Sequence, residues 1–210
     1  RHHSEHLGTA CDAPRRVCLS FGPGADALVR TGHAERIDKA EALRIRDLLK
    51  FEFFFPSRGA FQQELRDELA LLTPADGSGL SSSTARSLLE GTNLHLAHVV
   101  LRPFLDAYLV LADRIAAAGQ AGIVDEEGLL QEALRVGQQW ELERRIVSAE
   151  SVSLELFRTG LRVAAHRGLL RADEEPAPDR PSLAARRQEF VAELQTLAHQ
   201  LDLIAALARA

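Results

Sequence analysis

The sequence predicts an all-α protein, a helical bundle of about six or seven helices preceded by a loop-like N-terminal leader. Three observations predict this class. After residue 38, apolar residues recur at spacings of three and four, which is the period of an amphipathic helix. The strict alternation of polar and apolar residues that is typical of strands is almost absent. Clusters rich in glycine, proline and serine separate the periodic segments, as expected for loops.

The first 37 residues show no sustained period and contain several glycines and prolines. We therefore divide the chain into two parts. Residues 1–37 are a loop-rich leader or the remnant of a preceding domain, and residues 38–210 are a C-terminal helical domain. Within that domain, residues 171–181 are rich in charge and proline and are expected to be a linker.

Two helices are expected at the start of the domain. Asp38 with Glu41 three residues later is a capping-box arrangement, so the spacing predicts a helix that begins at Asp38. Pro56 ends it, because proline has no amide hydrogen and disfavours α geometry in the preceding residue. Ser57 is then expected to cap a second helix. Its apolar stripe consists of Phe61, Leu65, Leu69 and Leu72.

A loop-like segment at 73–84 separates these helices from a long one predicted over 94–118. Pro103 is expected to kink this helix or to start it afresh. Residues 104–115 are apolar on nearly all sides, which is typical of a central, buried helix.

A further helix is expected to begin at Asp125 or Glu126, with an apolar stripe that continues through Leu142 to Ile146. Ser151 is expected to open the next one.

Gly168 is expected to end that helix, since glycine favours the left-handed conformation found after helix C-termini. The last segment, 182–210, predicts a final amphipathic helix. Its apolar stripe consists of Phe190, Leu194, Leu197, Leu201, Ile204 and Leu207.

Composition limits the functional classes. The net charge of −5 and the pI of about 5.9 argue against a nucleic-acid surface, because phosphate binding requires a basic face. The sequence contains no run of about 18 apolar residues, which a transmembrane helix would need. No secretory signal is visible, and Cys11 and Cys18 are expected to be free intracellular thiols. The absence of methionine, even at position 1, favours a fragment or a processed product.

An aromatic cluster lies just before Pro56, with four of the nine phenylalanines in five residues. It can form part of the core, insert into a membrane surface beside Lys50 and Arg58, or dock on a partner domain. Burial in the core is the favoured interpretation. Helical spacing cannot place all four rings on one side, so at least one is expected to contact a partner or lipid. The candidate contact residues are Phe51, Phe53, Phe54 and Phe55.

Trp140 is the single tryptophan and is a further candidate for partner contact. It is expected to anchor a contact between helices, where its indole nitrogen needs an acceptor. A second set of charged residues is expected on solvated helix faces, although these residues could also meet another domain or lipid headgroups. The set comprises Arg102, Asp106, Arg114, Arg144 and Arg145.

Several segments together resemble a known family. They are residues 42–55 (ALRIRDLLKFEFFF), 101–108 (LRPFLDAY), 150–157 (ESVSLELF) and 164–170 (AAHRGLL). With the closing helix around Arg187–Phe190, they follow the order of the C-terminal helical region of bacterial glycerol-3-phosphate acyltransferases, of the actinobacterial type. The resemblance covers roughly residues 39–210.

The resemblance implies a parent protein that transfers a fatty acyl group from a thioester to glycerol 3-phosphate in phospholipid biosynthesis. This chain would be its accessory domain. Its partner would be the catalytic domain of the same polypeptide, and the parent would use acyl-CoA or acyl carrier protein. The expected location is the cytoplasm, peripheral on the inner face of the cell membrane. The alternative is a stand-alone helical module that binds a protein or a lipid.

The catalytic blocks of the family are not found here. In the family, a histidine and an aspartate with four residues between them act as general base and orienting group, followed by a hydrophobic strand. His33 and Asp38 match the spacing but lead into a charged helix, so they are only weak catalytic candidates. His95 and His98 share a helix face without further ligands. No metal site and no cofactor is therefore expected.

Overall fold

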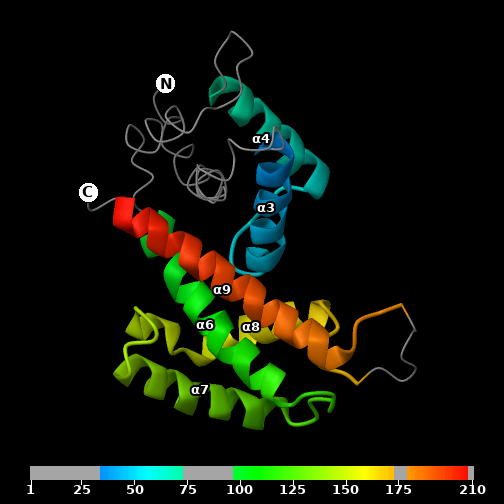
Figure 1. The fold of residues 1–210 in the computed structure, drawn as a ribbon, viewed down its shortest axis with the longest axis vertical. Coiled ribbons are helices and arrows are strands. Elements are labelled where there is room, and N and C mark those ends of the chain that lie inside the picture. The colour runs from blue at the N-terminus through cyan, green and yellow to red at the C-terminus, as the bar shows by residue number, and fades with distance from the viewer. Residues whose placement is uncertain (1–33, 73–96, 173–178, 208–210) are drawn as a thin grey trace, which may run out of the picture. The chain divides into compact units, whose positions relative to one another are not determined.

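The computed structural model describes residues 34–72, 97–172 and 179–207 (Figure 1). Within these ranges the chain forms six α-helices and one short 3₁₀-helix without any strand, which confirms the all-α class. The expected leader up to residue 33, the loop at 73–84 and the middle of the expected linker lie outside the described residues. Whether a domain boundary lies near residue 38 stays a prediction.

The chain divides into two compact units. One contains α3 (Ala34–Leu49) and α4 (Arg58–Leu72). The other is Val99–His199, which we call the four-helix unit. None of the helices in the described ranges is long and apolar enough to cross a bilayer.

Helix α3 begins earlier than the sequence predicts. It starts at Ala34, so Asp38 lies inside the helix and the prediction that Asp38 caps it is wrong. The residues before Asp38 include alanine, glutamate and arginine, which favour helix and extend it toward the N-terminus. The expected apolar face is confirmed, because Ile45 and Leu48 are buried.

Helix α4 begins where the sequence predicts. The Ser57 hydroxyl accepts a hydrogen bond from the Ala60 amide (3.3 Å), and the Ser57 carbonyl accepts one from the Phe61 amide (2.8 Å). Phe61 and Leu65 of the predicted stripe are buried. Helices α3 and α4 pack against each other, so their apolar stripes share one small core.

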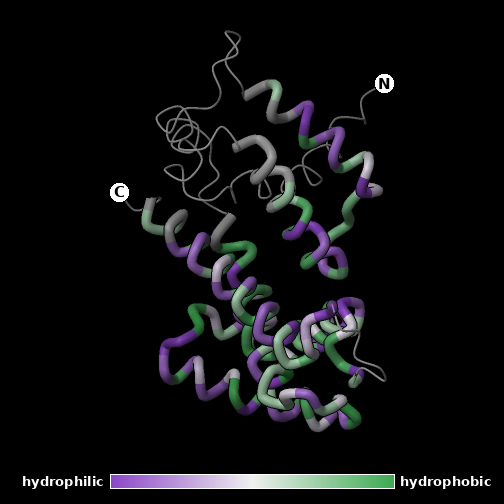
Figure 2. The backbone as a smooth tube through the Cα atoms, turned by 45° about the vertical axis from the view of Figure 1, so that its right-hand side comes forward, coloured by the Kyte–Doolittle hydropathy of each residue, from purple (hydrophilic) through white to green (hydrophobic). Residues whose placement is uncertain are grey.

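The four-helix unit is built around α6 (Ala97–Ala117), which runs without interruption through Pro103. The segment expected to be buried is buried, including Leu105, Tyr108, Leu111 and Ile115. The other helices are α7 (Glu126–Leu142), α8 (Leu154–His166) and α9 (Leu183–Leu207). Hydrophilic and hydrophobic residues are interspersed along these helices in Figure 2.

Two hydrogen bonds between residues far apart in sequence show that α9 runs antiparallel to α6. Near the start of α6, Arg102 Nη1 donates to the carbonyl oxygen of Ala198 (3.4 Å). Just beyond its end, the carbonyl oxygen of Gly119 accepts a hydrogen bond from Arg187 Nη1 (2.8 Å). Helix α8 approaches α6 at Gly160, where an added Cβ would lie 3.0 Å from a side-chain carbon of Tyr108. Helix α7 packs on α8.

The helix ends largely follow the sequence. Asp125 caps α7, its Oδ1 accepting from the Gly128 amide at 2.8 Å. Helix α8 begins after Ser153 and not at Ser151, because residues 149–151 form a 3₁₀ turn. Leu142 is the last residue of α7 and is exposed, so the prediction that the buried stripe continues through it is wrong.

Candidate functional site

The predicted aromatic cluster forms a sharp turn between α3 and α4. We call residues 50–57 the aromatic corner. The amides of Glu52 and Phe53 both donate to the carbonyl oxygen of Leu49, at 2.9 and 3.0 Å, and so close the end of α3. Pro56 and Ser57 then lead directly into α4. Helix α3 ends at Leu49, so the prediction that it continues to Pro56 is wrong. The residues between Leu49 and α4 form a tight connection instead, and their side chains point in several directions.

Arg46 fixes the inner side of the corner. Its Nη2 donates to the carbonyl oxygen of Pro56 (2.8 Å), and its Nη1 pairs with Asp47 Oδ1 (2.7 Å). Its guanidinium carbon lies 5.9 Å from the ring centroid of Phe55 and 5.8 Å from that of Phe61. The two rings meet edge to face, with centroids 5.8 Å apart. Phe55 is thus part of the interior of the corner.

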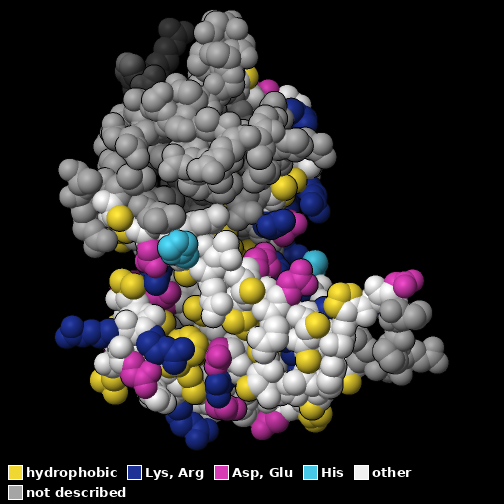
Figure 3. Space-filling view, in the orientation of Figure 1, with side chains coloured by type: hydrophobic (Ala, Val, Ile, Leu, Met, Phe, Trp, Pro, Cys, Tyr) yellow, Lys and Arg dark blue, Asp and Glu magenta, His cyan; other side chains and the backbone are white. Residues whose placement is uncertain are grey.

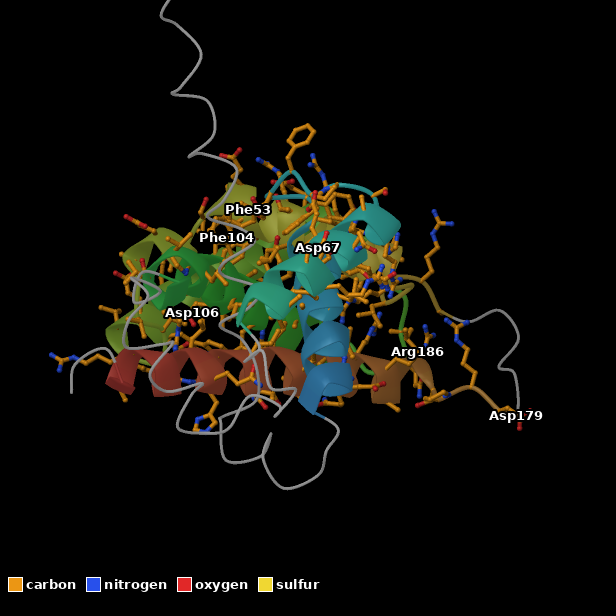
Figure 4. All side chains as sticks on the ribbon, turned by 90° about the horizontal axis from the view of Figure 1, so that it is seen from above. Phe53, Asp67, Phe104, Asp106, Asp179 and Arg186 are labelled. Atoms are coloured by element: carbon orange, nitrogen blue, oxygen red, sulfur yellow. The ribbon has the colours of Figure 1, made fainter. Side chains whose placement is uncertain are left out.

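The other three phenylalanines of the cluster differ in exposure. Phe53, labelled in Figure 4, is half-buried and lies edge-on to Phe55 at 6.4 Å. Phe51 is 42% exposed and Phe54 is 105% exposed. The favoured interpretation that the cluster is core is therefore wrong for Phe54. Successive residues of a tight turn point in different directions, so one ring had to face outward. Contact of these rings with a partner or membrane stays a prediction.

Trp140 is buried near the end of α7, with 7% of it exposed. The guanidinium carbon of Arg145 lies 3.8 Å from its ring centroid, and Arg145 also forms an ion pair with Glu143 at 3.7 Å. Arg144 between them has a left-handed backbone (φ 57°). The residue closes the helix in a position that glycine usually occupies. Partner contact by Trp140 stays a prediction.

Asp106 is almost fully buried on α6, where Figure 4 labels it. Its Oδ1 accepts from Arg102 Nε (2.8 Å) and its Oδ2 from the Val147 amide (2.9 Å). The expectation that Asp106 lies on a solvated face is wrong. The carboxylate holds the loop after α7 against α6 and is compensated by the arginine and the amide. The available signal was that Asp106 is the only charged residue in the stretch 104–112.

Arg187 is a second buried charge, and sequence reasoning missed its role. Its Nε donates to the carbonyl oxygen of Leu169 (2.8 Å) and its Nη1 to that of Gly119 (2.8 Å). Both acceptors follow helix C-termini, those of α8 and α6, where the helix dipole favours a cation. Burial lowers the pKa of Arg187, and neighbouring Arg186 lowers it further. Arg187 lies three residues before Phe190 on the predicted apolar stripe, which was the signal.

The remaining candidates for catalysis and metal binding fall at the edge of the described residues or beyond it. His33 and His95 lie outside the described residues, and Asp38 and His98 lie in α3 and α6 without described side chains. Within the part of the chain that the structure describes, no group of three His, Cys, Asp or Glu residues could hold a metal ion. On the face drawn in Figure 3, the described apolar, basic and acidic side chains are interspersed. The described side chains discussed above either hold helices and loops together or lie on the surface.

Comparison with known proteins defines the class. Residues 30–173 match the family model described as the glycerol-3-phosphate acyltransferase C-terminal region. This chain therefore belongs to that family, as its segments at 42–55 and 101–108 indicated. No solved structure matches it.

Three of its relatives are mycobacterial. The chain is 47% identical over 171 residues to the putative acyltransferase plsB1 of Mycobacterium bovis (strain ATCC BAA-935 / AF2122/97). The identity is the same for the putative acyltransferases plsB1 of Mycobacterium tuberculosis, strains CDC 1551 / Oshkosh and ATCC 25618 / H37Rv. The match covers 80% of this chain but only 27% of each relative.

Proposed function

We propose that this chain is the C-terminal accessory helical domain of a glycerol-3-phosphate 1-O-acyltransferase of phospholipid biosynthesis. The observation that carries the proposal is the pair of matches: a family model for this C-terminal region over residues 30–173, and acyltransferase relatives of which the chain covers only 27%. The reacting groups then lie in a catalytic domain of the same polypeptide. That domain takes the acyl group from acyl-CoA or acyl carrier protein.

The described structure supports an accessory role. Its buried charges hold helices and loops together: Asp106 connects α6 to the loop after α7, and Arg187 connects α9 to two helix ends. A general base needs instead to lie within hydrogen-bond reach of a reacting hydroxyl. The chain therefore acts by packing on the catalytic domain or by helping it to lie on the cytoplasmic face of the cell membrane.

The test is acyl transfer to glycerol 3-phosphate, measured as lysophosphatidate formed from a labelled donor in detergent. The full-length polypeptide is expected to form product, and the 210-residue chain alone is expected to form none. Within the full-length polypeptide, His33→Ala is expected to leave the rate unchanged, because the reacting histidine belongs to the catalytic domain. No product from the full-length polypeptide would refute the proposal. Turnover by the chain alone that His33→Ala abolishes would assign catalysis to this chain.

A further inference from the structure

The outer side of the aromatic corner carries an unusual combination of side chains. Phe54 is fully exposed, and Phe51 is 42% exposed. A phenylalanine left in water forgoes about 1.5–3 kcal/mol that burial would contribute. We call Lys50, Phe51, Phe54 and Arg58 the aromatic apex.

Two basic residues lie close in sequence to the exposed rings. Lys50 Nζ lies 5.1 Å from the ring centroid of Phe51. The Arg58 side chain is 63% exposed, and its ion pair with Asp47 is long, at 3.6 Å. Residues 44–58 contain four basic and two acidic side chains, a net charge of +2, whereas the whole chain carries −5. The apex is therefore locally basic in an acidic protein.

The inner side of the corner makes the apex rigid. Arg46 connects α3 to the Pro56 carbonyl, and the Phe55 and Phe61 rings pack under its guanidinium. Phe54 is therefore held outward by contacts on the inner side of the corner. A surface that meets the apex would not have to reorganise it, which lowers the entropic cost of binding.

We propose that the aromatic apex inserts into the interface of an anionic lipid bilayer. Phe54 enters the boundary between headgroups and acyl chains, while Lys50 and Arg58 contact lipid phosphates. This combination is typical of interfacial membrane attachment, where apolar burial and attraction to anionic lipid add together. Each cation near such a surface contributes about 1 kcal/mol.

Lipid fits the apex better than a protein groove does. A protein hot spot is a set of anchors surrounded by contacts that exclude water, whereas Phe54 is fully exposed and has long, flexible basic residues four positions before and after it in sequence. The sign of the local charge matches anionic headgroups. The inference rests on the proposed function in so far as that function places the polypeptide at a membrane surface.

The experiment measures partition of the 210-residue chain onto vesicles by co-sedimentation. One set of vesicles contains equal parts phosphatidylglycerol and phosphatidylcholine, and the other contains phosphatidylcholine alone. The chain is expected to bind the anionic vesicles and to bind less at high salt, because salt screens the cations. Phe54→Ser is expected to weaken partition about tenfold, since ring burial contributes about 1.5–3 kcal/mol and 1.4 kcal/mol is a factor of ten.

Two further variants separate the contributions. Lys50→Gln with Arg58→Gln is expected to weaken binding about tenfold or more and to remove most of the salt dependence. Phe54→Trp is expected to retain binding, because tryptophan favours the membrane interface. Leu142→Ser is the matched control: Leu142 is an equally conspicuous exposed apolar residue, at 86%, but lies outside the apex. Loss of the Leu142 side chain is expected to leave partition of the chain onto vesicles unchanged.

Binding of Phe54→Ser equal to that of the unmodified chain would overturn the inference, as would the absence of binding to anionic vesicles. Weakened association of Phe54→Ser with the separately expressed remainder of the polypeptide, with unchanged vesicle binding, would assign the apex to domain docking and also overturn it. The proposed function fails by a different measurement, acyl transfer in detergent by the unmodified full-length polypeptide. The two failures are therefore distinguishable.

Discussion

In the four-helix unit, charged side chains lie inside; in the aromatic corner, an apolar side chain lies outside. Asp106 and Arg187 are buried in the four-helix unit, with hydrogen bonds to backbone groups that helix ends and loops leave free. Phe54 is fully exposed at the corner, with Lys50 and Arg58 four residues before and after it in sequence. The buried charges fix connections between helices. The exposed ring, by contrast, contacts little of the folded chain, and the lipid proposal starts from this observation.

The strongest test of this contrast is Asp106→Ala. It leaves the Arg102 guanidinium and the Val147 amide without their carboxylate partner and is expected to lower the free energy of unfolding by about 3–5 kcal/mol. Urea denaturation measures this change. Asp113→Ala is the control, because Asp113 lies on the same helix but is partly exposed beside Arg114. Equal effects of the two variants would show that the loss of stability in Asp106→Ala does not come from the burial of its carboxylate.

A second test concerns the interior of the corner. Phe55→Ala removes the ring that packs against Phe61 and Arg46, and it is expected to lower the free energy of unfolding by about 2 kcal/mol. This is below the value for a fully buried phenylalanine because Phe55 is only half-buried. Phe51→Ala, at the more exposed end of the corner, is expected to cost less. The reverse order would contradict the assignment of Phe55 to the interior.

Substitutions at two helix ends in the four-helix unit are expected to change the free energy of unfolding by a smaller amount, and one of them is expected to raise it. Arg144 after α7 and Gly168 after α8 both have positive φ, at 57° and 67°, and both close the helix with a pair of backbone hydrogen bonds. Arg144→Gly is expected to raise the free energy of unfolding by about 1 kcal/mol, because glycine adopts this conformation without strain. Thermal unfolding detects the gain. Gly168→Ala is the reciprocal control and should destabilise.

The smallest effect is expected at the apex. Phe54→Asp should change the free energy of unfolding by less than about 0.5 kcal/mol, because the ring touches little of the folded chain. Calorimetric melting of the chain measures it, with Phe54→Ala as the control for the added charge. A large loss of stability from both variants would place Phe54 in a core and remove the contrast from which the lipid inference starts.

The sequence carries the helical class and most element boundaries because these depend on local chemistry. Helical periodicity predicted α7, α8 and α9, and the caps at Ser57 and Asp125 lie where serine and aspartate were expected. The start of α3 was wrong by four residues, since a possible cap does not stop good helix formers before it from joining the helix. Its end was also wrong, because the helix stops at Leu49 and not at Pro56. The family resemblance, which the family model confirms, also came from sequence alone.

Burial of particular polar and aromatic residues was decided by tertiary structure. Local pattern places Asp106 on a helix but does not show that a loop forty-one residues away in sequence offers it an amide. Nor does it show that Arg187 meets carbonyl oxygens at two helix ends, or which ring of the corner faces outward. Periodicity determines which face of a helix is apolar. Only the packed chain determines which polar group that face can hold, because the partners come from segments distant in sequence.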